Sequence, residues 1–304
     1  MDIKKKLDEP RSSIKYSQNF VKSPGLVAKL LDKSSITSAD TVYEIGSGTG
    51  VITAELTKYC KQVVAVEADS RLIDNLNENF NNSDNVKIIR GNFLDQSLPS
   101  QPYKIFSNIP FNITADIVRK LVEADNPPDD SYLFVQKEAA MKLAGKPYGG
   151  QETQFSVLTK PWFEFSEAHK FSKTDFQPAP AVEVVLLRVR KLPAPLVKAV
   201  ERPVYSDFIV YSFNTKKASL RKGLEDIFTH NQFKRLAREL HFDLKATPTE
   251  LGFEQWLGLF KYFMVGVIEE KQQLVRGAKA QQKQQQQKME KVHRTRTAKD
   301  WRDL

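Results

Sequence analysis

TVYEIGSGTGVITAELTKY, residues 41–59, places an apolar run directly before a glycine loop and a helical pattern directly after it. Glycines at such a junction allow a sharp turn and let backbone N–H groups approach a ligand closely. The spacing of Gly46, Gly48 and Gly50 is G-x-G-x-G, which differs from the dinucleotide motif G-x-G-x-x-G and from the phosphate loop G-x-x-x-x-G-K-[ST]. We therefore expect a strand–loop–helix unit that binds an adenosine-type ligand without a triphosphate.

The alternation of strand and helix patterns continues from this loop to residue 137. Apolar runs predict strands at Thr41–Ile45, Gln62–Glu67, Val86–Ile89, Tyr103–Phe106 and Tyr132–Val135. Amphipathic runs predict helices at Val51–Tyr59, Arg71–Phe80 and Thr114–Glu123. The strand runs lack strict polar alternation, which is typical of strands covered on both faces. The pattern predicts an α/β, Rossmann-like fold with a mostly parallel, doubly wound sheet. A last strand is expected at Val182–Val189, after the proline-rich turn Gln177–Pro180.

The chain changes character after Pro195. Helical periodicity dominates an aromatic and basic region, with helices expected at 204–213, 216–228, 232–240 and 253–265. Residues 271–304 contain eight Gln and few apolar groups, so they lack the apolar area that offsets chain entropy. We therefore predict a cofactor-binding domain over 11–195, a small all-helical domain over 196–268, and a basic tail over 269–304 that is mostly disordered, with some helix near its start.

The net charge of +9 is concentrated in the tail. Residues 271–304 hold ten Lys or Arg and three Asp or Glu, which leaves 36 basic and 34 acidic residues before them. Such a tail indicates a polyanionic partner, above all nucleic acid, and the alternative is a tail that only aids solubility.

Cysteine usage and hydropathy exclude several classes of protein. The single cysteine, Cys60, cannot form an internal disulfide, and no Cys/His cluster has zinc spacing. It reads as a small buried residue rather than a nucleophile. The first ten residues are charged, and no apolar run approaches the roughly 20 residues that span a bilayer. We expect a cytoplasmic monomer that uses neither a membrane nor a metal.

Polar side chains follow the second and third predicted strands. Glu67 ends the second strand, where a carboxylate can accept hydrogen bonds from two ribose hydroxyls of an adenosine cofactor. Asn92 follows the third strand and is placed to meet an adenine amine. Both positions are compatible with S-adenosylmethionine and with NAD, and Glu67 has the alternative of a solvated strand-end charge.

The most specific motif is Ser107-Asn108-Ile109-Pro110-Phe111-Asn112, after the fourth strand. The amine of a nucleobase is a poor nucleophile because its lone pair is delocalised into the ring. Two acceptors placed out of the ring plane, the Asn108 side-chain oxygen and the carbonyl of Ile109 or Pro110, would draw the nitrogen towards tetrahedral geometry. Pro110 locks the turn, and Phe111 can stack on the base. Catalysis would rest on positioning without a covalent intermediate or metal; a turn that only closes the strand is the alternative.

These motifs resemble the Erm family of 23S rRNA adenine N6-methyltransferases, close kin of the KsgA-type small-subunit rRNA dimethyltransferases. The resemblance covers about residues 11–268. The shared stretches are Tyr16–Val21 (YSQNFV), Glu44–Gly50, Glu67, Asn108–Phe111 and Phe176–Pro180 (FQPAP). Two further stretches resemble Erm members in particular: Asn231–Phe233 (NQF) and Phe253–Leu257 (FEQWL).

The resemblance implies S-adenosylmethionine as cofactor and an adenine in the peptidyl-transferase region of 23S rRNA as target, which confers resistance to macrolides, lincosamides and streptogramin B. It implies cofactor contacts from Asn19, the Val21 backbone, Gly46, Gly48, Glu67, Asn92 and Asn108. Two positions depart from the family pattern: Asn92 replaces the commoner Asp, and Phe111 replaces the commoner Tyr. Whether one or two methyl groups are added stays open.

Further residues are candidates for contact with the RNA. The resemblance gives Phe176 a possible place on the other face of the target base, and the alternative is a turn aromatic packed under the sheet edge. Basic clusters on predicted helices are candidates for phosphate contact: Lys216-Lys217, Arg221-Lys222 and Lys234-Arg235-Arg238. Three other functions stay open: the small-subunit sister enzyme, a non-enzymatic RNA-binding relative, and a dinucleotide oxidoreductase.

Overall fold

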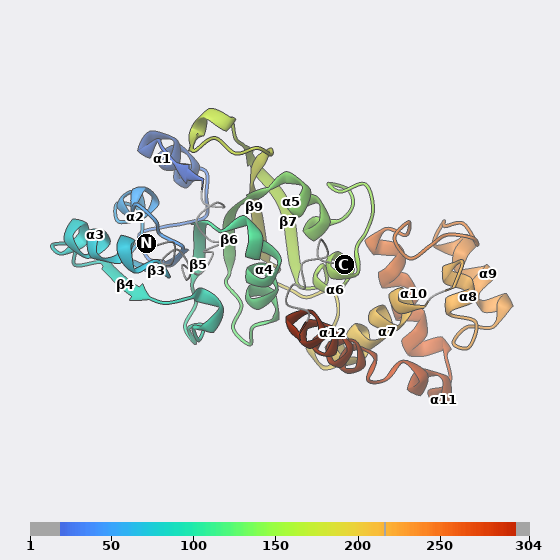
Figure 1. The fold of residues 1–304 in the computed structure, drawn as a ribbon. Helices are drawn as coiled ribbons and strands as arrows, with labels where there is room; N and C mark the ends of the chain where they lie inside the picture. The colour runs from blue at the N-terminus through green and yellow to red at the C-terminus, as the bar shows by residue number, and fades with distance from the viewer. Residues whose placement is uncertain (1–18, 216, 296–304) are drawn as a thin grey trace, which may run out of the picture. The chain divides into compact units, whose positions relative to one another are not determined.

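A computed structural model describes residues 19–215 and 217–295 of the chain (Figure 1). The chain forms two compact units. Unit 1 consists of residues up to 140 together with 164–191, and unit 2 consists of residues 141–163 together with those from 192 onward. Segment 141–163, which lies inside the predicted domain 11–195, therefore packs with the helical unit.

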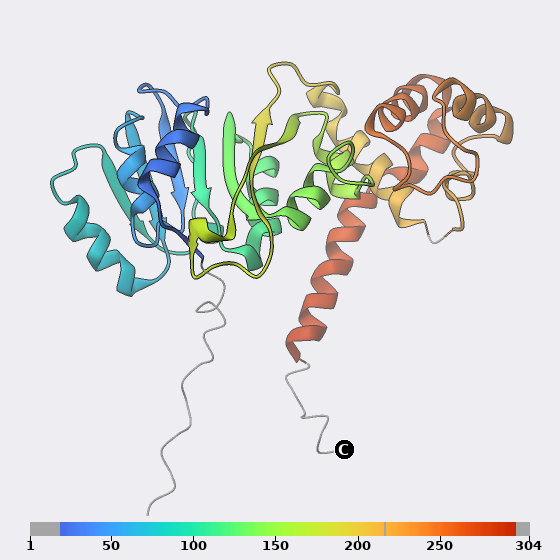
Figure 2. The same cartoon turned by 90° about the horizontal axis from the view of Figure 1, so that it is seen from above.

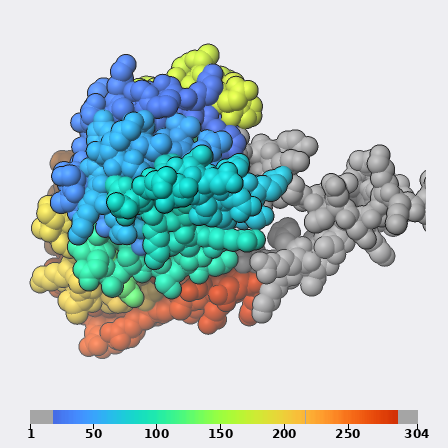
Figure 3. Space-filling view, turned by 90° about the vertical axis from the view of Figure 1, so that its left-hand side faces the viewer, coloured from blue at the N-terminus to red at the C-terminus, as the bar shows by residue number. Residues whose placement is uncertain are grey.

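Unit 1 is built on a seven-stranded sheet of order β4-β3-β2-β5-β6-β9-β7. Its strands are β2 (Thr41–Ile45), β3 (Gln62–Glu67), β4 (Val86–Arg90), β5 (Lys104–Asn108), β6 (Asp130–Gln136), β7 (Phe163–Lys170) and β9 (Val184–Lys191). Strands β2 to β6 pair in parallel, and β9 is antiparallel to β6. The predicted α/β fold with a mostly parallel sheet is confirmed. Figure 3 views unit 1 from the side of the edge strand β4 and the helix after β3.

The helices of unit 1 alternate with its strands (Figure 1). They are α1 (Pro24–Asp32), α2 (Val51–Leu56), α3 (Ser70–Phe80), α4 (Thr114–Glu123) and α5 (Lys137–Ala144), with single turns η2 (Phe93–Asp95), η3 (Phe111–Ile113) and η4 (Lys173–Asp175). Helix α1, which the sequence analysis did not predict, begins at a Ser23 cap with Pro24 in its first turn. It packs with α2 on a core that includes Val42, Phe106 and Phe134.

A two-stranded sheet lies beside the main one. Strand β1 (Phe20–Val21) pairs antiparallel with β8 (Phe176–Gln177), so that Phe20 faces Gln177 and Val21 faces Phe176 in register. This pairing fastens the segment before α1 to the segment before β9.

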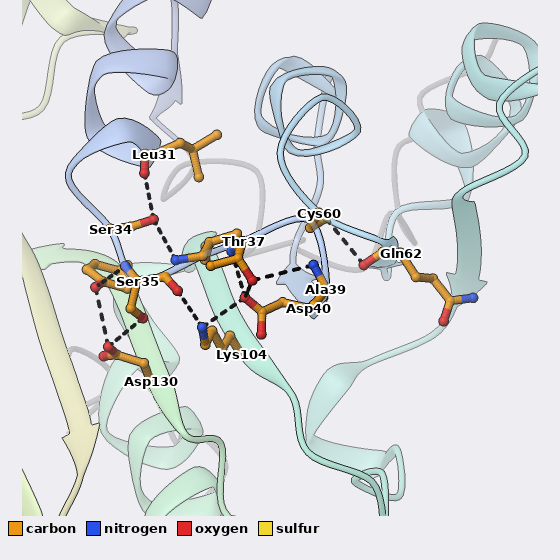
Figure 4. A network of polar contacts seen from close by, with 12 residues as sticks. Leu31, Ser34, Ser35, Thr37, Ala39, Asp40, Cys60, Gln62, Lys104 and Asp130 are labelled. Atoms are coloured by element: carbon orange, nitrogen blue, oxygen red, sulfur yellow. Dashed lines mark hydrogen bonds and ion pairs between the residues drawn. The ribbon is translucent and has the colours of Figure 1, made fainter.

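A polar network joins the amino ends of three neighbouring strands (Figure 4). Lys104, which opens β5, pairs with Asp40 at 2.8 Å, and the Ser35 hydroxyl donates to Asp130 at 2.8 Å. Arg188 also donates to Asp130. These contacts fix the end of the sheet opposite to the carboxyl ends of its strands.

Unit 2 is helical. Its helices are α6 (Gln154–Thr159), α7 (Arg202–Asn214), α8 (Leu220–Gly223), α9 (His230–Glu239), α10 (Phe253–Gly266), α11 (Glu269–Gln272) and α12 (Ala278–Thr295), with single turns η5 (Ala199–Glu201) and η6 (Gln273–Val275). Large aromatic side chains form its core: Tyr205, Phe208, Trp256, Phe260 and Phe263 are all at most 2% exposed.

The prediction of a mostly disordered tail is wrong for residues 269–295. They form α11, η6 and α12, and Val275 is fully buried. The start of α12 is held by hydrogen bonds from the Gly277 and Lys279 amides to the Asp207 carboxylate on α7. Such long-range contacts stabilise a helix that its own apolar content does not predict.

Candidate active site

A pocket lies at the carboxyl ends of β2 and β5, where the order of the sheet reverses. From β2 the chain proceeds to β3 on one side, and β5 lies on the other. Such a switch point opens a crevice in which open α/β sheets bind ligands. The pocket is lined by Asn19, Phe20, Gly46, Asn108, Ile109, Pro110 and Phe111.

Ser107 holds β2 and β5 together just below the pocket. The register between these strands pairs Val42 with Lys104 and Tyr43 with Ile105. Two residues further on, the buried Ser107 hydroxyl accepts from the Ile45 N–H at 3.0 Å and donates to the Ile45 carbonyl at 2.6 Å. At this position the Ser107 side chain makes the hydrogen bonds between β2 and β5 that the backbone would otherwise make.

The glycine loop follows β2 in a conformation that requires glycine. The φ angles of Gly46, Gly48 and Gly50 are 75°, 57° and 83°, in the left-handed region. A Cβ added to Gly48 would lie 2.6 Å from the ring of Phe20. The loop is therefore in close contact with the segment that precedes α1.

Asn108 has a defined orientation. Its Nδ2 donates to the Asn19 carbonyl at 2.5 Å, and since a carbonyl can only accept, the amide nitrogen must face Asn19. Its Oδ1 stays available as an acceptor at the pocket. The Pro110 carbonyl accepts from the Ile113 N–H at 3.2 Å, whereas no backbone N–H of the described chain donates to the Ile109 carbonyl. Of the two carbonyls that the sequence left open, that of Ile109 is the better second acceptor.

Phe111 is half-buried, lines the pocket and packs against the core below it. Phe20 lines the same pocket, and the sequence analysis did not assign it a role. Its place directly beside Asn19, which lines the same pocket, was the signal.

Comparison with known proteins supports the interpretation of this geometry. The family profile described as ribosomal RNA adenine dimethylase matches residues 10–264. The chain belongs to this family.

Individual members of the ribosomal RNA adenine dimethylase family match over most of their length. An rRNA adenine N-6-methyltransferase of Lysinibacillus sphaericus is 31% identical, over 83% of this chain and 97% of the relative. The ribosomal RNA small subunit methyltransferase A of Acaryochloris marina is 29% identical, over 82% and 96%. The crystal structure of the 23S rRNA methyltransferase ErmE superposes with a TM-score of 0.74 at 25% identity, covering 81% of this chain and all of that one.

The protein is thus an rRNA adenine N6-methyltransferase with S-adenosylmethionine as its cofactor. Two observations fit that cofactor to the carboxyl ends of β2 and β3. Gly46, in the left-handed region, leaves space next to Pro110 that a side chain would fill. The buried Glu67 carboxylate accepts three backbone N–H groups, from Gly48, Ala68 and Asp69, each at 2.8 Å. A carboxylate has about four acceptor positions, so one is left for a ribose hydroxyl.

The other expected cofactor residues lie outside the pocket lining. Val21 is buried in the core through β1. Asn92 is exposed and caps η2, accepting from the Leu94 N–H at 3.1 Å and donating to Asp95 at 3.1 Å. Its Oδ1 keeps a second lone pair. Roles for Val21 and Asn92 at the cofactor stay predictions.

The expected contact of Phe176 with the target base is wrong. The Phe176 side chain is 1% exposed and packs in the core of unit 1, edge-on to Phe171 with ring centroids 5.3 Å apart. A ring enclosed in this way cannot also face a base. The alternative, an aromatic packed under the sheet edge, agrees with the structure.

Glu44 is a buried acid that the sequence analysis quoted within the glycine motif without giving it a role. It is 1% exposed, and its Oε2 accepts from the Thr53 hydroxyl at 2.5 Å. Burial raises the pKa of Glu44 from 4.5 to about 8; the charge of Glu67 acts in the same direction, and the Thr53 hydrogen bond opposes it. At neutral pH Glu44 is therefore largely protonated.

The predicted phosphate-binding residues belong to unit 2. Lys217 and Lys222 are exposed, and Lys222 pairs with Glu225 at 3.2 Å. Arg221 is half-buried and contacts the His230 ring at 3.1 Å. Lys216 lies outside the described residues.

Several other chemistries find no support in the part of the chain that the structure describes. No group of three or more His, Cys, Asp or Glu there could hold a metal ion. No helix there is long and apolar enough to cross a membrane. Burial raises the pKa of the Cys60 thiol to about 11, which disfavours the thiolate that a nucleophile requires.

Proposed function

We propose that this enzyme methylates N6 of an adenine in the peptidyl-transferase region of 23S rRNA and thereby confers resistance to macrolides, lincosamides and streptogramin B. One observation supports the chemistry: Asn108, Ile109 and Phe111 line a single pocket, and the Asn108 amide nitrogen is turned towards Asn19, which leaves its Oδ1 free to accept. The enzyme would act in the cytoplasm, as a monomer.

In this proposal the cofactor supplies a methyl group on an electrophilic sulfonium. The cofactor would be held by Gly46, Gly48, Glu67, Asn92 and the Asn19–Val21 segment. At the target base, Asn108 Oδ1 and the Ile109 carbonyl would each accept a hydrogen bond from one N6–H group. These two hydrogen bonds would turn the nitrogen lone pair out of the ring plane. Such fixed acceptors act mainly in the transition state.

Among the residues that the structure describes, none that lines the pocket can act as a general base. Its seven lining residues carry amide, aromatic, aliphatic or no side chains, and none of them titrates near neutral pH. The proton that N6 loses on methylation would therefore leave to water. This agrees with catalysis by positioning, in which two acceptors hold the amine and Phe111 holds the base plane.

The 23S target is supported by the similarity to ErmE over all of that chain and by two Erm-like stretches. Gln232 caps α9 through Thr229 and donates to the Gly266 carbonyl at 3.2 Å. Gln255 donates to the Leu240 and His241 carbonyls at 3.0 and 2.9 Å. These residues stabilise the helical unit itself, so the likeness to Erm includes its internal framework.

The second candidate is methylation of small-subunit rRNA, favoured by the similarity to the Acaryochloris marina enzyme. Incubation of the full chain with methyl-tritiated S-adenosylmethionine and separate 23S and 16S transcripts distinguishes the two. We expect label on 23S RNA, recovered as N6-methylated adenosine after digestion. Label on the 16S transcript alone would establish the alternative. Nucleoside mass spectrometry of the product decides between one and two methyl groups.

A further inference from the structure

The C-terminal helix α12 lies beyond the part of the chain that defines the family. The family profile ends at residue 264, and the relatives from Lysinibacillus and Acaryochloris, although covered almost completely, match only 83% and 82% of this chain. Residues 271–304 nevertheless carry a net charge of +7. An added basic segment needs a function of its own.

Over the part of α12 whose side chains the structure describes, residues 278–288, the contacts with other helices lie at its beginning. The Asp207 carboxylate on α7 accepts from the Gly277 N–H at 2.8 Å and from the Lys279 N–H at 2.9 Å, which caps the unpaired amides of the helix start. One turn later, the Gln282 side chain donates to Gln154 at 3.0 Å and to Asn214 at 3.2 Å. These contacts fix where the helix starts and in which direction it leaves α7.

Beyond Gln282 the described side chains of α12 point into solvent. Residues 283–288 are all exposed, and the helix extends away from α7 in Figure 2. Lys283 and Lys288 form no ion pair within the described chain, and residues 271–289 contain no acidic residue. Residues 281–288 are all Gln or Lys, so this stretch has no apolar stripe with which to bind a protein surface. Its uncompensated positive charge fits a polyanion.

We propose that α12 is an RNA-binding arm, in which Asp207 and Gln282 fix the base of the helix and Lys283 and Lys288 contact phosphates of the substrate RNA. The proposal rests on the proposed function only in that the substrate is an rRNA. Phosphate contacts add affinity without reading sequence, so the arm strengthens binding and leaves the choice of adenine to the pocket. A fixed helix presents its charges at lower entropic cost than a free tail.

The test compares three full-length proteins: wild type, Lys283→Gln/Lys288→Gln, and a control, Lys61→Gln/Lys87→Gln. The control removes two exposed lysines of unit 1 and so changes the net charge equally. Binding to the 23S and 16S transcripts is measured between 50 and 200 mM salt. Each phosphate contact contributes about 0.7–0.9 to the slope of log affinity against log salt, so the α12 variant should lose about 1.4–1.8 from it and the control much less.

A further variant, Asp207→Ala, tests the anchor. It keeps every lysine but removes the cap, so RNA affinity at low salt should fall while the melting temperature of the core changes little. The proposal would be overturned if the Lys283→Gln/Lys288→Gln variant showed the same salt slope as the control. It would also be overturned if Asp207→Ala lost helix content by circular dichroism and still bound RNA with wild-type affinity. Because binding is measured on both transcripts, methylation of 16S instead of 23S RNA would refute the proposed target and leave the test of α12 intact.

Discussion

The side-chain amide of Asn108 donates to the backbone carbonyl of Asn19 across 89 positions of sequence, at 2.5 Å. This contact joins the end of β5 to the segment before β1 and fixes which end of the Asn108 amide faces the pocket. It also explains why an acid of the same shape would not replace Asn108, since a carboxylate cannot donate.

Asn108→Asp should therefore lower kcat for RNA methylation by roughly 5- to 150-fold, because losing a part-buried hydrogen bond and placing a charge against a carbonyl costs about 1–3 kcal/mol. Single-turnover methyl transfer measures the effect. Asn81→Asp, an exposed change at the end of α3, is the control and should be active. Wild-type turnover by Asn108→Asp would exclude the proposed orientation.

Phe111→Ala should reduce methyl transfer while the cofactor still binds. A base stacked on an aromatic ring gains about 1–3 kcal/mol, which corresponds to a loss of roughly 5- to 150-fold. Phe111→Tyr retains the ring and should stay within a few-fold of wild type. The two variants are compared by kcat/KM on the RNA and by calorimetry with S-adenosylmethionine; full activity in the Ala variant would rule out stacking.

Glu67→Gln should weaken S-adenosylmethionine binding by about 1–3 kcal/mol, since an amide offers one acceptor oxygen in place of two. With one acceptor oxygen fewer, either the Gly48 N–H or the ribose hydroxyl loses its hydrogen-bond acceptor. Titration calorimetry gives the affinity, and the melting temperature shows how much of the change comes from the loop itself. An unchanged dissociation constant would remove Glu67 from the cofactor site.

The buried Glu44 makes stability depend on pH in a defined window. Its pKa is 4.5 in the unfolded chain and about 8 in the folded protein, so the folded state binds more protons between these values. Its contribution is complete below pH 4.5, and the free energy of unfolding decreases as the pH rises from 4.5 to about 8. Glu44→Gln should abolish this decline and show its largest stabilisation relative to wild type near pH 8.

Melting temperatures from pH 5 to 9 test this prediction. Glu78→Gln, which removes an exposed carboxylate from α3, is the matched control and should follow wild type. Parallel curves for Glu44→Gln and wild type would mean that Glu44 does not titrate in this window.

Much of unit 1 follows from local sequence pattern. Strands β2 and β3 and helix α4 have the predicted bounds, because apolar runs and amphipathic spacing agree there with tertiary burial. Strand β7 was not predicted, since its sequence FEFSEAHK alternates apolar and polar residues only weakly and only its first residue is buried at this edge of the sheet. Helix α12 depends on Asp207, seventy positions away from Gly277, which no local pattern reveals.

The candidate site was predictable where one motif contains the chemistry. The Asn108–Phe111 motif and Gly46 were expected at one site, and the structure places them in one pocket. For Phe176 the sequence left two alternatives open, because a turn sequence does not indicate which side of the chain packs on the core. The raised pKa of Glu44 was hidden for a related reason: it comes first from burial and then from the nearby Glu67 carboxylate, and both arise only when the chain folds.

Segment 141–163 has a consequence for modularity. The chain leaves unit 1 after residue 140, returns at 164 and leaves again at 191, and the Tyr205 hydroxyl donates to the Val157 carbonyl at 2.7 Å within unit 2. Neither unit is therefore a contiguous stretch of sequence. A fragment cut near residue 195 would carry an orphaned part of the helical unit, so chimaeras that exchange RNA-recognition modules between such enzymes should graft segment 141–163 together with the C-terminal half.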